Sequence, residues 1–144
     1  MSSLFLKNAN VIDVSTGNIS LQSIRIENGI IQEIGKNVIK NNSAESIDLK
    51  GDFVMPGLCD AHVHVTAFTA DFARLKNTSP FYVGIKALEI LRGMLSRGFT
   101  TVRDAGGADW GLAKHISENP TSGPRILFCG HALSQTGGHG DMRG

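Results

Sequence analysis

The sequence has little of what marks several large classes of protein. Only two of its 144 residues are cysteines, Cys59 and Cys129, and they form no CxxC or zinc-ribbon spacing. Both stand in apolar runs, which predicts two buried thiols in a reducing compartment rather than a disulfide. No apolar run approaches the roughly 20 residues that span a bilayer, and the N-terminus lacks the features of a signal peptide. We therefore expect a cytoplasmic protein without a membrane partner.

An excess of charge of either sign is also missing. The net charge is +1, and the fractions of charged (19%) and apolar (41%) residues are those of a globular protein. Bulk electrostatics therefore favours neither nucleic acid nor an anionic membrane as a partner. The glycine-rich motifs GxGxxG and GxxxxGK[ST] are absent too, so we do not expect Gly106-Gly107 to bind a nucleotide.

Residues 1–55 have the pattern of short β-strands joined by turns. Strand-like segments lie at 4–6, 11–14, 23–27, 30–34 and 46–49. Asn28-Gly29 stands between two of them, and this pair is typical of a tight β-hairpin. Because fifty residues of short strands bury little apolar area, we expect part of a larger β-domain. A self-sufficient small β-domain is the alternative.

Residues 56–144 have a different pattern, in which strands alternate with helices. Strands are predicted at 58–65, 99–102 and 125–129, and helices at 81–97 and 109–118. Ser79-Pro80 supplies an N-cap and a first-turn proline for the first helix. Such βα repeats are typical of a parallel sheet, either open and doubly wound or closed into a (β/α)8 barrel. In both architectures the chemistry lies at the carboxyl ends of the strands.

Polar residues stand at those strand ends. His62 and His64 are two residues apart near the end of the first strand, so regular alternation would place both imidazoles on one face, together with Asp60. Two imidazoles in this arrangement can share one divalent ion, and the Asp60 carboxylate would orient one imidazole or its neighbours without binding the ion itself. The alternative is a pair of core histidines held by ordinary hydrogen bonds. On the inward face of a buried strand, unpaired imidazoles would be costly, which favours the metal.

Three segments resemble a known family. Residues 54–64 (VMPGLCDAHVH) resemble the PGLxDxHxH opening of the (β/α)8 barrel of the amidohydrolase superfamily, and residues 98–107 (GFTTVRDAGG) resemble its second barrel strand. Residues 132–141 (ALSQTGGHGD) are similar to a loop of its prolidase-like and imidazolonepropionase-related branch, whose members include dipeptidases that cleave Xaa-Pro or Xaa-Arg/Lys substrates. Residues 1–55 resemble the N-terminal strands of the β-sandwich that accompanies this barrel.

The resemblance implies a hydrolase with one or two divalent ions, most often zinc, that cleaves a C–N amide bond with a metal-activated water. His62 and His64 would be metal ligands. The remaining ligands and the catalytic proton carrier would come from later strands, so no catalytic residue is expected in this chain. We therefore expect the N-terminal part of a longer, homo-oligomeric parent, inactive alone. The implied substrate is an Xaa-Pro-type or related dipeptide. The alternatives are a cyclic amide, such as an imidazolone or lactam, and a non-catalytic fragment or degenerate paralogue.

The other polar candidates are assigned lesser roles. His139 lies between glycines and is predicted to contact substrate, with Asp141 and Arg143 as weaker candidates for binding a substrate terminus. Asp104 is predicted to cap the following turn or to brace the site from behind the ligands, rather than to carry a proton. Arg103 is expected to form a structural ion pair. His115 and His131 are expected to have no special role.

Overall fold

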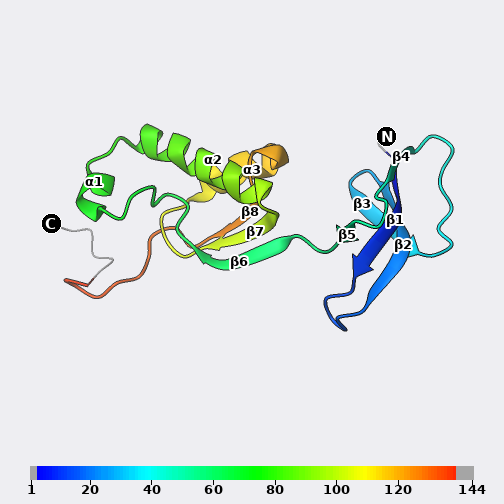
Figure 1. The fold of residues 1–144 in the computed structure, drawn as a ribbon. Helices are drawn as coiled ribbons and strands as arrows, with labels where there is room; N and C mark the ends of the chain where they lie inside the picture. Colours follow the sequence, from blue (N-terminus) through cyan, green and yellow to red (C-terminus); the bar gives the residue numbers. More distant parts are fainter. Residues whose placement is uncertain (1–2, 139–144) are drawn as a thin grey trace. The chain divides into compact units, whose positions relative to one another are not determined.

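A computed structural model describes residues 3–138 of the chain (Figure 1). They form two compact units that divide between Pro56 and Gly57. The N-terminal unit is built from strands, whereas the C-terminal unit alternates strands with helices. The fold is therefore mixed α/β with parallel βα units after a β-rich segment, as the sequence predicts.

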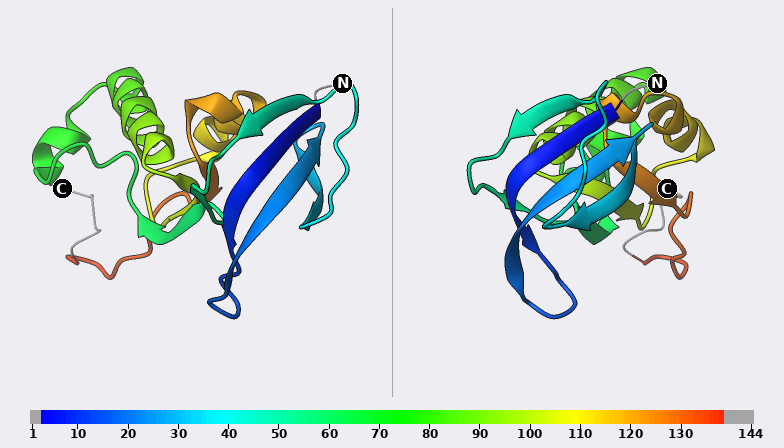
Figure 2. Two further views of the ribbon diagram at one scale, coloured as in Figure 1. Left: turned by 45° about the vertical axis from the view of Figure 1, so that its right-hand side comes forward. Right: turned by 90° about the vertical axis from the view of Figure 1, so that its right-hand side faces the viewer.

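The N-terminal unit contains one sheet of five strands. They are β1 (Ser3–Ile12), β2 (Ile19–Glu27), β3 (Ile30–Gly35), β4 (Glu45–Asp48) and β5 (Phe53–Val54). The order is β3-β2-β1-β4, and β5 follows β4 along the same edge of β1. β1, β2 and β3 are antiparallel neighbours, and the β1–β2 loop projects beyond the other strands (Figure 2). The second sheet of the implied sandwich is not among residues 3–56.

Local backbone geometry explains the hairpins of this sheet. Asn28 and Gly29 have φ values of 52° and 77°, the left-handed conformations that a tight β2–β3 turn requires. β1 is one long strand where the sequence predicts two short ones, at 4–6 and 11–14. Its pairing with β2 shifts between Leu6 and Ala9, and Asn8 has a φ of 56°. This β-bulge absorbs the polar interruption without ending the strand.

The C-terminal unit is a three-stranded parallel sheet covered by helices. Its elements are β6 (Leu58–Val63), α1 (Phe72–Lys76), α2 (Pro80–Ser96), β7 (Phe99–Asp104), α3 (Trp110–Glu118), a 3-10 turn (Pro120–Ser122) and β8 (Arg125–Phe128). The sheet order is β6-β7-β8. α2 and α3 lie on the same side of this sheet (Figure 1). α1 was not predicted.

The core of this unit lies between the sheet and the two long helices. Leu91 and Met94 of α2 and Ile116 of α3 pack against Val102 and Ile126 of the sheet. The opposite face is open in the described residues, and Leu127 there is 53% exposed.

The exposure of the two cysteines corrects an expectation from the sequence. The prediction of buried cysteines is wrong, because Cys59 and Cys129 are exposed free thiols, and Cys59 pairs with Thr101 on the uncovered side of the sheet. Among the described residues, no helix combines the length and apolar character needed to cross a membrane.

Candidate functional site

The candidate site lies where β6 and β7 end, at one edge of the parallel sheet. β6 is irregular there: Asp60 pairs with Val102 and Val63 with Asp104, so β6 carries one more residue than β7 between the two pairs. The regular alternation predicted for Asp60, His62 and His64 is therefore broken by a bulge. Bulges beside functional sites redirect side chains, and this one lies at the histidine pair.

Two side chains hold the bulged segment by its backbone. Asp60 Oδ1 accepts the backbone N–H of His62 at 3.1 Å, so this carboxylate contacts the peptide of His62. Arg103 Nε donates to the carbonyl oxygen of Ala61 at 2.7 Å. Among residues 3–138 Arg103 forms this bond instead of the expected ion pair. β7 thus fixes a β6 carbonyl group within the irregular part of the strand pairing.

The two imidazoles lie close together. Their ring centroids are 5.3 Å apart at an interplanar angle of 76°. His64 Nδ1 is 2.9 Å from the carbonyl oxygen of Gly106, and because a carbonyl only accepts, Nδ1 carries the hydrogen. The Nε2 lone pair of His64 is then available as a ligand. A backbone carbonyl on the second ring nitrogen is a common way to orient a metal-binding histidine.

The donors suit a divalent metal, although they are too few to complete a site. Imidazole nitrogen is a preferred zinc ligand, and a catalytic zinc site has three protein ligands. Within residues 3–138, no group of three or more His, Cys, Asp or Glu side chains is placed to hold an ion. His62 and His64 are exposed, not buried as expected, because nothing described covers their face of the sheet. The histidine pair fits a metal as part of a larger ligand set.

Asp104 is buried next to the exposed histidine pair. It ends β7, has no exposed area and accepts three backbone N–H groups. These contacts make it a turn-forming residue next to His64.

The loop after β7 contains the partner that sequence reasoning missed, the carbonyl group of Gly106. Gly106 and Gly107 have φ values of 157° and 118°. A Cβ on Gly107 would clash with Thr66 Oγ1, so the β7 loop packs closely on the β6 loop. The closeness of these two loops could be predicted, since neighbouring parallel strands bring their following loops together. The residue types, however, do not show which backbone carbonyl group accepts a hydrogen bond.

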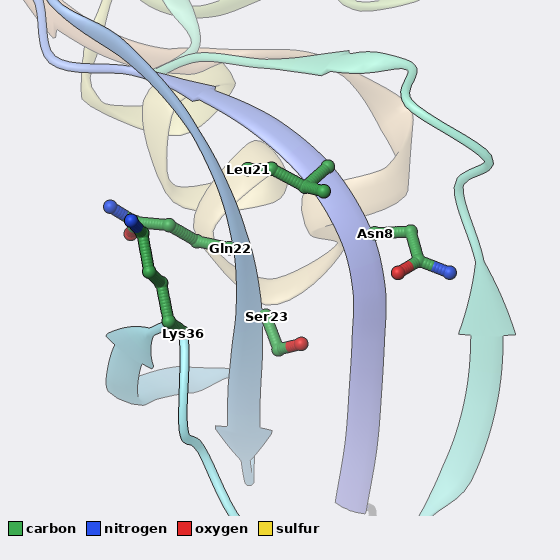
Figure 3. Close-up of a pocket in the computed structure, with 5 residues that line it drawn as sticks. All are labelled: Asn8, Leu21, Gln22, Ser23 and Lys36. Atoms are coloured by element: carbon green, nitrogen blue, oxygen red, sulfur yellow. The ribbon is translucent and has the colours of Figure 1, made fainter.

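The remaining candidates are not brought to the histidine pair. His139, Asp141 and Arg143 lie outside the described residues. His115 is exposed on α3, and His131 is exposed after β8. A separate hollow of about 390 Å³ lies in the N-terminal unit (Figure 3). Its lining is Asn8, Leu21, Gln22, Ser23 and Lys36, which includes no histidine, cysteine or carboxylate.

Comparisons with known proteins agree with this geometry. The model of the Amidohydrolase family matches residues 53–143. A prolidase solved with N-methylphosphonate-L-proline is 43% identical, with a TM-score of 0.93 over 99% of this chain and 35% of its own. A Xaa-Pro dipeptidase solved with bound methionine is 30% identical, with a TM-score of 0.80 over 97% of this chain and 36% of its own.

A curated relative extends the comparison. The dihydroorotase of Trichlorobacter lovleyi is 44% identical over 62 residues, which are 43% of this chain and 15% of that protein. The chain thus spans about a third of the length of the two solved structures and less of this relative. The family match includes β6 and β7 and therefore the whole candidate site. The chain therefore belongs to the amidohydrolase family, in which it resembles the prolidases.

Proposed function

We propose that the full-length protein, a chain of the length of these relatives that contains residues 1–144, is a metal-dependent hydrolase of C–N amide bonds. The observation that carries the proposal is the His62–His64 pair at the end of β6, with His64 oriented by the carbonyl of Gly106. Barrel enzymes place their chemistry at this end of parallel strands. The substrate we propose is an Xaa-Pro-type dipeptide, supported by the 43% identity to a prolidase over nearly the whole chain.

His62 and His64 would hold the ion, and zinc is the metal we propose because neutral imidazole suits it. When bound, a divalent ion supplies an activated water and polarises the scissile carbonyl. Asp60 and Arg103 keep the bulge of β6 in the shape that carries His62. Gly106 keeps the Nδ1 hydrogen of His64 engaged, so that Nε2 is the free donor. His139 remains our proposal for a substrate contact.

A cyclic amide is the second substrate class. Dihydroorotate, for which one relative is named, is a ring that contains an amide, and that relative is 44% identical over 62 residues. Ring and dipeptide amides present the same polarised carbonyl to an activated water. Residues 3–138 contain no feature that favours the ring, so we rank the dipeptide first.

The proposal is tested in the full-length protein with His62→Ala and His64→Ala. We expect both variants to lose bound metal, measured by elemental analysis, and to lose measurable turnover of an Xaa-Pro dipeptide. His115→Ala is the matched control, because His115 is an exposed histidine on α3 away from the pair. It should retain wild-type metal content and turnover.

Other results would change the conclusion in defined ways. Turnover of dihydroorotate but of no dipeptide would select the cyclic amide. A wild-type protein that binds no metal and cleaves neither substrate would identify a non-catalytic paralogue. Full activity in the absence of both histidines would remove the proposal.

A further inference from the structure

Asp104 is the one charged residue with no exposed area among the buried residues of the described chain. Its Oδ2 accepts the N–H of Val65 at 2.8 Å, and its Oδ1 accepts those of Gly106 and Ala108 at 2.9 and 3.1 Å. Among residues 3–138 no cation forms an ion pair with it. A buried carboxylate is costly unless hydrogen bonds replace its water, and here backbone groups of two loops do so.

These contacts form a closed circuit with His64. Val65 is the residue after His64, and its N–H binds one oxygen of Asp104. Gly106 binds the other oxygen through its N–H, while its carbonyl oxygen accepts the Nδ1 hydrogen of His64. Asp104 therefore sets the separation between the backbone that carries the imidazole and the acceptor that orients it.

The loops of this circuit have little freedom to shift. The N–H of Gly107 donates to the carbonyl oxygen of Gly130 at 2.9 Å, which ties the β7 loop to the loop after β8. An added Cβ on Gly106 would lie 2.8 Å from Ala132 Cβ, and one on Gly107 would clash with Thr66 Oγ1. This close packing does not replace the bonds that Asp104 makes to Val65 and Gly106, so we expect a change at Asp104 to move the Gly106 carbonyl relative to His64.

We propose that Asp104 is a positioning residue that fixes the orientation and tautomer of the His64 imidazole. By binding the N–H groups of both Val65 and Gly106, Asp104 fixes the position of the Gly106 carbonyl relative to His64. This keeps the hydrogen on Nδ1 and directs the Nε2 lone pair to the metal. The part that concerns the metal rests on the proposed function; the part that concerns the ring does not. Asp104 itself reaches neither metal nor substrate, since backbone N–H groups occupy its oxygens and it has no exposed area.

The test is Asp104→Asn in the full-length protein, because it keeps the shape and removes one acceptor. If the amide oxygen of the asparagine still accepts the N–H groups of Gly106 and Ala108, its NH2 group faces the N–H of Val65, and the bond to Val65 is lost. If the amide is flipped, the bond to Val65 remains and the bonds to Gly106 and Ala108 are lost. The matched control is Asp109→Asn, since Asp109 Oδ1 accepts the N–H of Leu112 at 3.0 Å as the N-cap of α3, without contact to His64.

The first readout is the ring tautomer of His64, by nitrogen NMR of 15N-histidine protein stripped of metal, at a pH where the ring is neutral. We expect an Nδ1–H ring in the wild type and in Asp109→Asn, and a shift toward Nε2–H in Asp104→Asn. The second readout is zinc affinity, which should fall about 10- to 100-fold in Asp104→Asn, as for other residues that orient a ligand, and remain unchanged in Asp109→Asn.

The outcomes separate the two proposals. A folded Asp104→Asn protein with an Nδ1–H ring and wild-type zinc affinity overturns the inference. A tautomer shift in a protein that binds no divalent metal supports Asp104 as the positioning residue and refutes the metallohydrolase.

The wild-type protein decides the case if Asp104→Asn does not fold. An Nε2–H ring, or a Val65 amide that exchanges as fast as an exposed one, overturns the inference. An Nδ1–H ring with slow exchange at Val65, Gly106 and Ala108 supports it.

Discussion

At the scale of single residues, several aspartates in the described part of the chain organise backbone N–H groups. Several aspartates accept such a group from a residue two to four positions later: Asp13, Asp48, Asp60, Asp71, Asp104 and Asp109. Residue type and spacing predicted this for Asp104, as a turn cap, and Asp109 starts its helix as expected. The bond from Asp104 to Val65 joins residues 39 apart, and local spacing gives no sign of it.

Asp13 offers a pH-dependent test of such a turn. Hydrogen bonds from the side chains of Ser15 and Thr16 and from the Ser15 N–H lower the pKa of Asp13 from its ordinary value of 3.8 to about 2. Because the folded-state pKa is depressed, the turn's contribution to stability is complete above pH 3.8 and is lost as the pH falls through about 2. Carboxyl NMR titration should show the low pKa, and Ser15→Ala, which removes the largest cause, should raise it. An ordinary pKa in the wild type would contradict this account.

Gly107 offers a test of the close loop packing. Gly107→Ala should destabilise the full-length protein by about 1–3 kcal/mol, because it adds both an unfavourable φ and a clash with Thr66 Oγ1. Gly130→Ala is the control for backbone strain alone, since Gly130 has a φ of 77° and open space around its Cβ position. Denaturant unfolding should show the larger loss for Gly107→Ala, with partial rescue by Thr66→Ala. Equal losses in the two glycine variants would show that Thr66 does not restrict the loop.

At the scale of elements, periodicity and capping predicted most of the C-terminal unit. The helix predicted at 81–97 is α2 (Pro80–Ser96), and the strand predicted at 58–65 is β6 (Leu58–Val63). The bulge in β6 was not predicted, because it arises from pairing with β7 and from the bonds of Asp60 and Arg103. The five-residue helix α1 is too short to give a helical pattern. Local patterns thus defined the elements, whereas tertiary contacts determined the site's details.

α2 should contribute to stability through one face only. Leu91 is fully buried against the sheet, whereas Phe81 on the same helix is 87% exposed. We expect Leu91→Ala to lower the free energy of unfolding by about 2–5 kcal/mol, since it leaves a cavity in the core. Phe81→Ala should change it by less than about 0.5 kcal/mol. Denaturant unfolding of the full-length protein checks both values, and a larger loss for Phe81→Ala would show that another segment covers that residue.

At the scale of the whole molecule, a complete metal site needs ligands beyond the described residues. The chain spans about a third of the length of the solved structures it matches, and two imidazoles are fewer than a catalytic zinc site needs. The measurement that tests the central claim most directly is anomalous X-ray diffraction at the zinc edge from crystals of the full-length protein. We predict an anomalous peak about 2.0–2.1 Å from a ring nitrogen of both His62 and His64, with Nδ1 of His64 still on the carbonyl of Gly106. Zinc-saturated crystals with no peak at these two rings would contradict the account.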